Sequence, residues 1–397
     1  MNRTKLEQWI ERVEGIPYLT RENLQDLQLR RLNETLARLP KSQGLPREVS
    51  SLDALSCLPF TTPQMLSDNP GRYLATSQAQ VSRVISGATS GTTGPAKRVF
   101  YTEGDCQHTV GFFAAGISEM LSPGEKCLIA FPFSGAFGLG DLIARAVESL
   151  GAIPIRGGFG TCWEEAARQI EQTGATAYIG FPVPLLGLLR LYPGLPIRHA
   201  LVSGDACPAG VMGELESLLG SPLYPHYGSR ECGLGGAVTC PALEGMHLRE
   251  NHIIAEIIDE NGNVQPDGEY GELVITTIGA DAMPLIRYKT GDYTRILPPC
   301  PCGSVTKRLD TVSRRDGEIS IEDLDSACFR IEGLVDYRAS LDGSLTIEAR
   351  TVCPGLEARI HDAVTSLYAD LEVVVHASLC RHSDRPMYMG KRHILRL

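Results

Sequence analysis

The chain has 397 residues, of which 43% are hydrophobic and 21% are charged, and its formal net charge is −10. This length and composition fit about two ordinary globular domains, and the acidic balance argues against a nucleic-acid partner. The amphipathic N-terminal segment lacks the apolar core of a signal peptide, and no stretch reaches the ~18 apolar residues of a membrane span. We therefore expect a cytoplasmic protein with no membrane partner, whose twelve cysteines are reduced thiols or metal ligands.

The first part of the chain predicts helices followed by alternating strands and helices. Leucines at three- and four-residue spacing indicate helix within residues 1–45, whereas residues 46–80 look irregular. From about residue 81 to 230, short apolar runs alternate with helical patterns. The expected strands are Cys127–Phe131, Ala152–Ile155, Ala177–Gly180 and His199–Val202, and the expected helices are Asp141–Leu150, Trp163–Thr173 and Leu185–Leu191. This alternation predicts an α/β sheet with functional sites at the strand ends.

After residue 245 the pattern changes to short strands separated by turn signals. Ile253–Ile258, Gly271–Thr277 and Tyr293–Leu297 predict a small antiparallel β unit. Two strand-like runs, Leu345–Ala349 and Leu371–His376, flank an amphipathic segment near Leu356–Leu367 and predict a small α+β domain. We expect a large N-terminal domain over residues 1–312, a hinge at 313–317 and a small C-terminal domain at 318–397.

The segment Thr89–Lys97, with the sequence TSGTTGPAK, has the composition of a phosphate-binding loop. Its glycines and proline keep the backbone bent, so N–H groups can converge on phosphate oxygens, and its hydroxyls add further donors. It is not a kinase-type P-loop, because Lys97 is followed by Arg98 and Val99. A flexible surface loop rich in Ser, Thr and Gly is the alternative interpretation.

Polar groups that a protein core would not need occur in several later segments. Tyr227–Glu231 combines an aromatic ring that can stack on a base with a carboxylate that can hold Mg²⁺. Asp292 follows a glycine at a strand end, where a carboxylate can accept hydrogen bonds from both hydroxyls of a ribose. Arg314–Asp316 and Pro386–Lys391 complete the set. Each segment alone is better explained as a turn or a solvated surface.

In chain order, these motifs read TSGTTG…K, YGxxE, YKTGD, RxD and PxxxGK. This order resembles the adenylate-forming (acyl-AMP) superfamily over nearly the whole chain. Within it, the YGSRE, GELVITT, PLIRY and CPCG segments resemble the phenylacetate–CoA ligase branch and its capsule-biosynthesis relatives. The resemblance implies an α/β fold: a large N-terminal adenylate-forming domain with α/β sheets and a small β unit, and a small, shortened α+β C-terminal domain.

The resemblance also implies an activity and roles for single residues. The chain would use ATP to activate a carboxylic acid, aryl or related, as acyl-AMP, release pyrophosphate, and pass the acyl group to a thiol such as that of CoA. Lys391 would stabilise the attack on the α-phosphorus, Glu231 would ligate Mg²⁺, and Asp316 would be the hinge between the domains. The implied ATP- and AMP-binding residues are Ser90, Gly91, Thr92, Thr93, Gly94 and Lys97 for the phosphates, Gly204, Asp205, Ala206, Tyr227 and Gly228 around adenine, and Asp292 with Arg314 at the ribose.

Three cysteines and one histidine form a separate constellation. Cys240 and His247, with Cys300 and Cys302, could supply three thiolates and an imidazole to a tetrahedral zinc ion. The spacing is not that of a zinc finger, and a plain turn with a surface histidine is the alternative. The branch resemblance implies a structural zinc at these positions.

The acid pocket is indicated by aromatic and small residues at two candidate strand ends. The residues expected to line it are Phe133, Ser134, Gly135, Phe137 and Phe181, with ordinary core packing as the alternative.

The sequence departs from the superfamily pattern at the hinge. Ser313–Gly317 replaces the usual Gly-Arg-x-Asp-Asp, and the glycine-rich hairpin that normally follows is shortened to Glu318–Asp323. That hairpin lines the pantetheine tunnel in the family, so the acceptor stays open: CoA, a carrier-protein thiol, an amine or a hydroxyl. A non-catalytic nucleotide-binding homologue is a further alternative, and a homodimer is a possible assembly.

Overall fold

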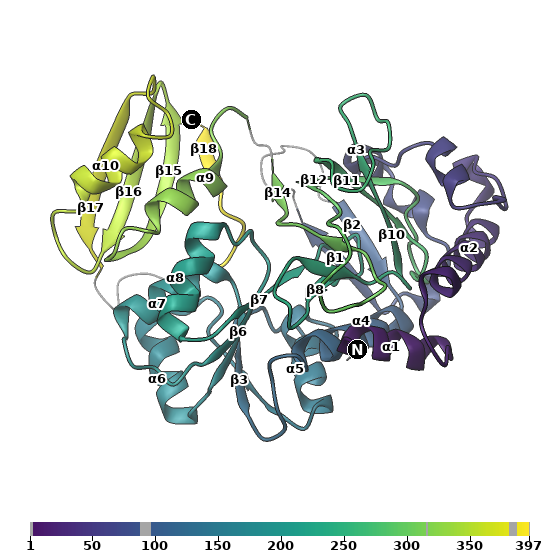
Figure 1. The fold of residues 1–397 in the computed structure, drawn as a ribbon, viewed down its shortest axis with the longest axis horizontal. Coiled ribbons are helices and arrows are strands. Elements are labelled where there is room, and N and C mark those ends of the chain that lie inside the picture. The colour runs from purple at the N-terminus through teal and green to yellow at the C-terminus, as the bar shows by residue number, and fades with distance from the viewer. Residues whose placement is uncertain (1–2, 88–96, 315–316, 381–386, 397) are drawn as a thin grey trace. The chain divides into compact units, whose positions relative to one another are not determined.

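The computed structural model describes residues 3–87, 97–314, 317–380 and 387–396 (Figure 1). Its internal contacts divide the chain into two units, each made of two segments. Unit 1 comprises residues 1–119 and 226–312, and unit 2 comprises residues 120–225 and 313–397. The chain passes from unit 2 into unit 1 within strand β7 (Leu223–Tyr227). The division into domains at the hinge stays a prediction.

The first segment of unit 2 is a parallel sheet covered by helices. Its strands lie in the order β4 (Ile153–Arg156), β3 (Lys126–Ile129), β5 (Ala177–Gly180), β6 (His199–Val202) and β7. The connecting helices are α5 (Leu139–Ser149), α6 (Trp163–Thr173), α7 (Pro182–Leu191) and α8 (Ala209–Leu219). The chain runs outward from β3 to β4 and then returns to β5, so right-handed crossovers put α5 on one face and α6, α7 and α8 on the other (Figure 1). Ligands of α/β sheets bind at such a reversal.

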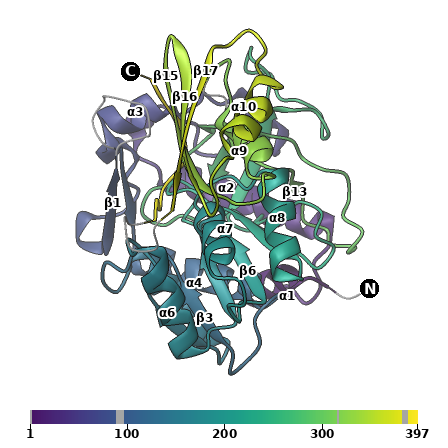
Figure 2. The ribbon, with the colours of Figure 1, turned by 90° about the vertical axis from the view of Figure 1, so that its left-hand side faces the viewer.

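The second segment of unit 2 is a small sheet with two helices. Its elements are β14 (Ser313–Arg314), α9 (Ile321–Cys328), β15 (Leu334–Asp342), β16 (Ser344–Thr351), α10 (Glu357–Thr365), β17 (Val373–Leu379) and β18 (Ile394–Arg396). The sheet has the order β17-β16-β15-β18, and α9 and α10 cover one of its faces (Figure 2). This segment confirms the α+β character that the sequence predicted.

The two segments of unit 2 share one hydrophobic core. Leu188 of α7 and Val211 of α8 belong to the same buried cluster as Phe329 and Val335 of the C-terminal segment. Arg190 of α7 also joins the two segments of unit 2, because its guanidinium donates a hydrogen bond to the carbonyl of Phe329 at 2.6 Å. Burial of apolar surface between the two segments stabilises their contact by ~25 cal/mol for each Å² removed from water.

Unit 1 combines helices with antiparallel sheets. Its helices are α1 (Lys5–Glu14), α2 (Arg21–Arg38), α3 (Pro63–Asp68) and α4 (Glu103–Ile117), with short 3₁₀ turns at Lys41–Gln43, Asp53–Cys57, Pro70–Tyr73 and Gln78–Gln80. The strands β1 (Arg83–Gly87) and β2 (Lys97–Tyr101) pair antiparallel, as do β10 (Ile253–Ile258), β11 (Gly271–Thr277) and β12 (Tyr288–Thr294). A third antiparallel set joins the end of β7 to β8 (Ala237–Thr239), β9 (Met246–Leu248) and β13 (Arg308–Leu309). Among the described residues, no helix has the length and hydropathy to cross a bilayer.

The helical character expected within residues 1–45 is confirmed as the two helices α1 and α2, and Gly15, with φ 66°, ends α1. Two local predictions were wrong. The strand expected at Tyr293–Leu297 is β12, which begins at Tyr288, where the backbone of Lys289 bonds to the carbonyl of Thr61. The expected remnant hairpin at Glu318–Asp323 runs into helix α9, because the Ser320 side chain accepts from the N–H of Asp323 and caps that helix.

Candidate active site

The predicted phosphate loop joins the two strands of a hairpin in unit 1. Gly87 at the end of β1 lies opposite Lys97 at the start of β2. The loop residues Ser90, Gly91, Thr92, Thr93 and Gly94 lie outside the described residues. Lys97 is therefore the only member of this predicted set among the residues that the structure describes.

Lys97 is a buried cation bound to a buried acid. Its ammonium nitrogen lies 2.6 Å from Oε1 of Glu231 and 2.9 Å from the hydroxyl of Tyr288. The Tyr288 hydroxyl also donates to the same carboxylate oxygen, at 3.2 Å. The side chains of Lys97 and Glu231 are only 8% and 6% exposed. A buried charge is tolerated only when it is paired and hydrogen-bonded, and this pair meets both conditions.

The electrostatics keep Glu231 ionised. Burial by itself would raise the pKa of this carboxyl, but the Lys97 ammonium and the Arg230 guanidinium outweigh burial and leave the pKa below its ordinary value. Burial and the Glu231 charge together raise the pKa of the Tyr288 phenol, so its hydroxyl stays a donor. The site thus presents an anionic oxygen donor of the kind that Mg²⁺ prefers.

A second acid lies in the same part of unit 1. The hydroxyl of Tyr227, at the end of β7, donates to Oδ2 of Asp292 in β12 at 2.8 Å. The Thr290 hydroxyl accepts from the backbone N–H of Asp292 at 3.0 Å. Burial, followed by the Asp292 charge, raises the pKa of Tyr227 well above its ordinary value. Gly228 follows, and a Cβ there would lie 2.2 Å from the carbonyl oxygen of Leu234, so only glycine fits this turn.

In unit 2, aromatic rings meet at the strand ends of the parallel sheet. The rings of Phe131, after β3, and Phe181, after β5, lie 5.1 Å apart between centroids. Gly204, after β6, has φ +86°, and a Cβ there would lie 2.7 Å from the Phe181 ring. Asp205 and Ala206 continue this turn. The structure therefore brings the turn Gly204–Ala206 and Phe181, all predicted site residues, to the reversal between β3 and β5. An α/β sheet binds ligands at such a reversal.

The remaining predicted pocket residues lie in the loop between β3 and α5. Phe133 packs under the Arg156 guanidinium, 5.1 Å from the ring centroid, and the backbone of Ser134 donates to Asp141 at 3.1 Å. Gly135 is exposed, and Phe137 is partly buried. The ring that contacts Phe181 is that of Phe131, which lies near the start of this loop.

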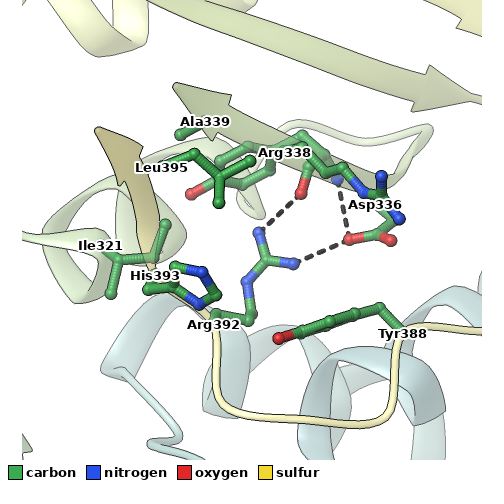
Figure 3. Close-up of a pocket in the computed structure, with 9 residues that line it drawn as sticks. Ile321, Asp336, Arg338, Ala339, Tyr388, Arg392, His393 and Leu395 are labelled. Atoms are coloured by element: carbon green, nitrogen blue, oxygen red, sulfur yellow. Dashed lines mark hydrogen bonds and ion pairs between the residues drawn. The ribbon is translucent and has the colours of Figure 1, made fainter. Parts of the chain in front are cut away.

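The C-terminal tail places Lys391 on the surface of unit 2. Figure 3 shows the neighbouring side chains of Tyr388, Arg392 and His393 around a cavity of about 240 Å³ that strand β15 also lines. The backbone of Arg314 donates to Glu322 at 3.0 Å. Arg314 belongs to unit 2 and its predicted ribose partner Asp292 to unit 1. The hinge residue Asp316 lies outside the described residues.

The predicted metal ligands gather in unit 1. One ligand atom from each of Cys240, His247, Cys300 and Cys302 lies within 4.8 Å of all the others. The sulfurs of Cys240 and Cys300 are 3.7 Å apart, and the Cys302 sulfur is 3.5 Å from Nε2 of His247. A tetrahedron with Zn–S of ~2.3 Å and Zn–N of ~2.0–2.1 Å has edges of about 3.8 Å between sulfurs and about 3.6 Å from sulfur to nitrogen. The donor set and spacing fit zinc.

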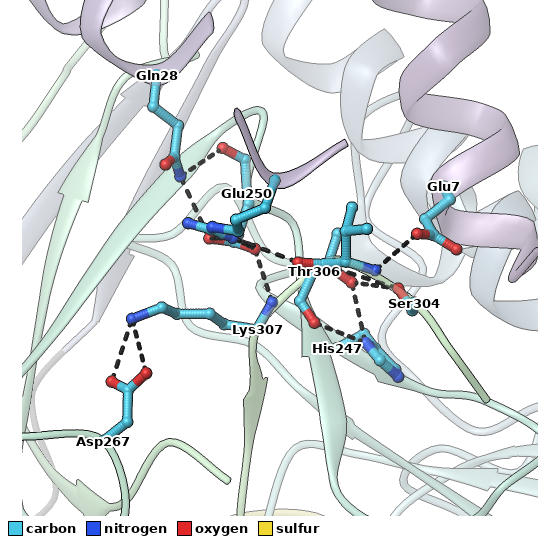
Figure 4. Close-up of polar contacts among 10 residues, drawn as sticks. Glu7, Gln28, His247, Glu250, Asp267, Ser304, Thr306 and Lys307 are labelled. Carbon is cyan, nitrogen blue, oxygen red and sulfur yellow. Dashed lines mark hydrogen bonds and ion pairs between the residues drawn. The ribbon is translucent and has the colours of Figure 1, made fainter. Parts of the chain in front are cut away.

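Hydrogen bonds orient the histidine of this cluster, as Figure 4 shows. Nδ1 of His247 lies 2.9 Å from the Thr306 hydroxyl and 3.2 Å from the Thr306 carbonyl, which leaves Nε2 toward the sulfurs. The flanking backbone is tied to the N-terminal helices, because Val305 donates to Glu7 at 2.8 Å. Lys307 donates through its backbone to Glu250 at 2.7 Å, and Gln28 binds the Glu250 carbonyl at 3.0 Å.

Sequence reasoning missed two residues that organise these sites. Tyr288 begins the YKTGD motif, but the spacing gives no sign that its hydroxyl would contact both Lys97 and Glu231, which lie 191 and 57 residues away in the chain. Arg392 follows Lys391 directly and is bound by acids from distant segments. Its position directly after a predicted catalytic lysine was the only signal that the sequence offered.

Comparison with known proteins gives consistent results. The family model described as AMP-binding enzyme matches residues 87–280. The phenylacetate–coenzyme A ligase of Aromatoleum evansii is 30% identical over 96% of this chain and 88% of its own length. That of Escherichia coli K12 is 30% identical over 76% of this chain and 73% of its own.

Among solved structures, 2-hydroxyisobutyryl-CoA ligase with its acyl-AMP bound shares the fold. It has a TM-score of 0.78 at 18% identity, over 93% of this chain and 88% of its own. The amide bond synthetase of Marinactinospora thermotolerans matches with a TM-score of 0.54 at 17% identity, over 79% and 68%. These motifs, the buried acid sites and relatives at 30% identity lead to one conclusion: the chain belongs to the family of AMP-binding, adenylate-forming enzymes, in the branch of the phenylacetate–CoA ligases.

Proposed function

We propose that this chain is an AMP-forming acid–thiol ligase that activates a carboxylic acid with ATP and transfers the acyl group to CoA. In the first step an oxygen of the acid attacks the α-phosphorus of ATP, the bond to the β-phosphate breaks, and pyrophosphate leaves. In the second step the CoA sulfur attacks the acyl carbonyl, the bond to AMP breaks, and the thiol proton is lost to solvent. Aryl acids are the favoured substrate class.

The observation that carries the proposal is the buried Lys97–Glu231 pair, 2.6 Å apart. A family member that had lost catalysis would have no reason to keep a charged pair where apolar side chains are as stable or more stable. In this resting arrangement of the site, the Lys97 ammonium and the Glu231 carboxylate neutralise each other. With nucleotide bound, Lys97 would turn to phosphate oxygens and Glu231 would hold Mg²⁺, which supplies positive charge to the triphosphate.

The other predicted residues fit the same assignment. Asp292, already an acceptor for the Tyr227 hydroxyl, would accept from the ribose hydroxyls. Gly204, Asp205 and Ala206 would line the adenine together with Tyr227, and Arg314 would assist at the ribose. Lys391 would stabilise charge as the acid attacks, which is electrostatic catalysis by a placed cation. The loop over Ser90–Gly94 would hold the departing phosphates.

The aromatic cluster supports an aryl or similarly flat apolar acid. Phe131 and Phe181 meet at the sheet reversal, and Gly204 packs against their rings without a side chain of its own. Such a site binds by apolar burial with a few polar groups that fix orientation. Phenylacetate is the first acid to test, because it is the substrate named for the sequence relatives.

The acceptor has one specific alternative. Helix α9 begins at Ile321, so residues 318–320 leave no room for the hairpin that lines the pantetheine tunnel in the family. A carrier-protein thiol, an amine or a hydroxyl can replace CoA without such a tunnel. The relatives named as CoA ligases favour CoA over these acceptors.

Zinc belongs to the same proposal as a structural ion. Cys240, Cys300, Cys302 and His247 would bind it as three thiolates and an imidazole, and it would stabilise the sheet of β8, β9 and β13 without taking part in the reaction. A zinc site of three thiolates requires reduced cysteines, which a reducing compartment maintains, so we place the enzyme in the cytoplasm.

The test is pyrophosphate release from purified enzyme with ATP and Mg²⁺ across a panel of acids, with and without CoA. We expect release that depends on an acid and a thioester product that depends on CoA. Release that does not respond to any acid would refute adenylation. Acid-dependent release with no change in turnover or product on adding CoA would refute CoA as acceptor and leave the carrier protein, amine or hydroxyl.

A further inference from the structure

The tail that carries Lys391 is fixed on both sides of the lysine within unit 2. Before it, the N–H of Met387 donates to the carbonyl of Thr161 at 2.9 Å, and the Met387 side chain is buried. After it, β18 pairs in parallel with β15, starting with Ile394 beside Ala339. Arg392 stands between these anchors and follows the lysine directly.

The guanidinium of Arg392 is held on every side. Its Nε lies 3.0 and 2.9 Å from the two carboxylate oxygens of Asp325, and Nη1 lies 2.8 Å from Oδ1 of Asp336. Nη2 donates to the Tyr337 carbonyl at 3.1 Å. Figure 3 shows the guanidinium directed at Asp336 and away from Tyr388. The rings of Phe329 and Tyr337 lie 5.2 and 4.5 Å from its central carbon. Such a planar fork fixes orientation as well as position.

The peptide group between Lys391 and Arg392 is bound at both of its polar atoms. Its carbonyl accepts from the Tyr388 hydroxyl at 2.9 Å, and its N–H donates to Oδ2 of Asp205 at 2.9 Å. Because a peptide group is planar, it cannot turn without breaking one of these bonds. The direction in which the chain leaves Lys391 is therefore fixed.

The tail leads into strand β18, and burial alternates along it from Lys391 onward. The Arg392 side chain is 7% exposed and Ile394 is partly buried, whereas Lys391 and His393 are exposed. Successive side chains of an extended chain point to opposite sides. Because Arg392 is held by Asp325 and Asp336, Lys391 therefore points outward.

We propose that Arg392 is the positioning residue for Lys391, and that Asp205, Asp325 and Asp336 form its socket. Asp325 and Asp336 lie in the C-terminal segment of unit 2, whereas Asp205 belongs to the turn after β6 that we assign to the nucleotide. The socket thus connects the nucleotide-binding turn to the catalytic lysine. The inference rests on the proposed function, in which Lys391 acts in the adenylation step.

The obvious alternative is that Arg392 only stabilises the fold. A positioning residue acts through Lys391, so its loss should harm the one step that uses Lys391. A structural residue should lower stability and harm both steps together. The two half-reactions, measured separately, distinguish these roles.

The experiment compares wild type with Arg392→Ala, Arg392→Lys, Lys391→Ala and the double variant Lys391→Ala/Arg392→Ala. Adenylation is measured as acid-dependent ATP–pyrophosphate exchange, and thioester formation is measured from supplied acyl-AMP and CoA. Arg338→Ala is the matched control, because Arg338 lies on the same strand and is exposed. Circular dichroism confirms that each variant is folded.

For Arg392→Ala we expect kcat for exchange to fall ~100-fold, the cost of a catalytic group misplaced by about 1 Å. We expect KM for ATP and the rate of thioester formation to change by less than ~3-fold. This is well below the ~10-fold change that corresponds to 1.4 kcal/mol. The kcat for exchange of Arg392→Lys should lie between those of wild type and Arg392→Ala, since an ammonium cannot form the planar contacts. The double variant should be no slower than Lys391→Ala, because residues that act as a unit are non-additive.

Hydrogen exchange of the tail provides a readout that needs no activity. The peptide containing Arg392 should exchange faster in Arg392→Ala and in Asp205→Ala than in wild type. Equal exchange in a folded Arg392→Ala, additive losses in the double variant, or parallel loss of both half-reactions would each overturn the proposal. If wild type shows no acid-dependent exchange of pyrophosphate, the proposed function fails, while the hydrogen-exchange result still decides whether Arg392 holds the tail.

Discussion

The ammonium of Lys97 lies 2.6 Å from the carboxylate of Glu231, a residue 134 positions later in the chain. Both side chains are buried, so each charge depends on the other. Removing one partner of a buried pair leaves an uncompensated charge, which costs more than the pair contributes when intact. The pair is thus both a structural element of unit 1 and, in our proposal, the resting state of the nucleotide site.

The first prediction concerns this pair. Lys97→Met should lower the free energy of unfolding by ~3–5 kcal/mol, because it leaves the Glu231 carboxylate buried without a cation. Urea unfolding at pH 7.5 measures the loss. Lys97→Met/Glu231→Gln should regain most of it, while both variants should lack adenylation activity. A double variant as unstable as the sum of the single variants would contradict the coupling.

The second prediction concerns the metal cluster. Purified protein should contain about one zinc per chain, and Cys300→Ser should remove it and lower Tm. Thr306→Val should weaken zinc binding by ~10–100-fold in a chelator competition, because the His247 ring loses the hydroxyl that orients it. Cys57→Ser, at an exposed thiol outside the cluster, is the control. Wild-type protein that contains no zinc by elemental analysis would remove the assignment.

The third prediction concerns Gly204. Alanine there should cost ~1–3 kcal/mol of stability, because φ is +86° and the added Cβ would meet the Phe181 ring at 2.7 Å. It should also weaken binding of the acid. Gly213→Ala is the matched control in the same unit, since Gly213 lies in helix α8 with nothing within 4 Å of a built Cβ. That change should be neutral or stabilising by up to ~1 kcal/mol. Equal effects of the two changes on thermal unfolding would refute the steric explanation.

Local patterns in the sequence predicted the parallel sheet well. Helix α6 and strands β5, β6, β10 and β11 have the predicted bounds, because their apolar periodicity reflects their own burial. The missed elements depend on distant partners. Strand β2 is defined by pairing with β1 across the predicted phosphate loop, and helix α4, which is buried on most of its surface, has no clear polar face.

The candidate sites divide in the same way. Residue types and motif order indicated Glu231, Asp292 and the zinc ligands, because that chemistry needs those side chains. The partners are set by tertiary contacts that no spacing reveals. Tyr288 reaches Lys97, and Arg392 reaches Asp205 across 187 residues. The sequence showed the chemistry of the sites but not the contacts that hold them.

The fourth prediction concerns pH. Burial raises the pKa of Asp205 to about 6; the Asp325 charge acts in the same direction, while the backbone N–H and the guanidinium of Arg392 oppose it. The unfolded chain has the ordinary value of ~3.9. Between these values the native state binds more protons than the unfolded state, so this group makes stability fall as pH rises from about 4 to about 6 and adds no further change above that.

Asp205→Asn removes this titration while its amide oxygen can still accept from the Arg392 N–H. The stability of Asp205→Asn relative to wild type should therefore increase between pH 4 and pH 6.5 and then level off. Urea unfolding of both proteins at several pH values measures the difference, in which the shared titrating groups cancel. Asp342→Asn, at an exposed carboxyl in the same unit, is the matched control. A difference that stays constant with pH would mean that Asp205 is ionised over this whole range, and that its contact with the tail, rather than burial, controls its charge.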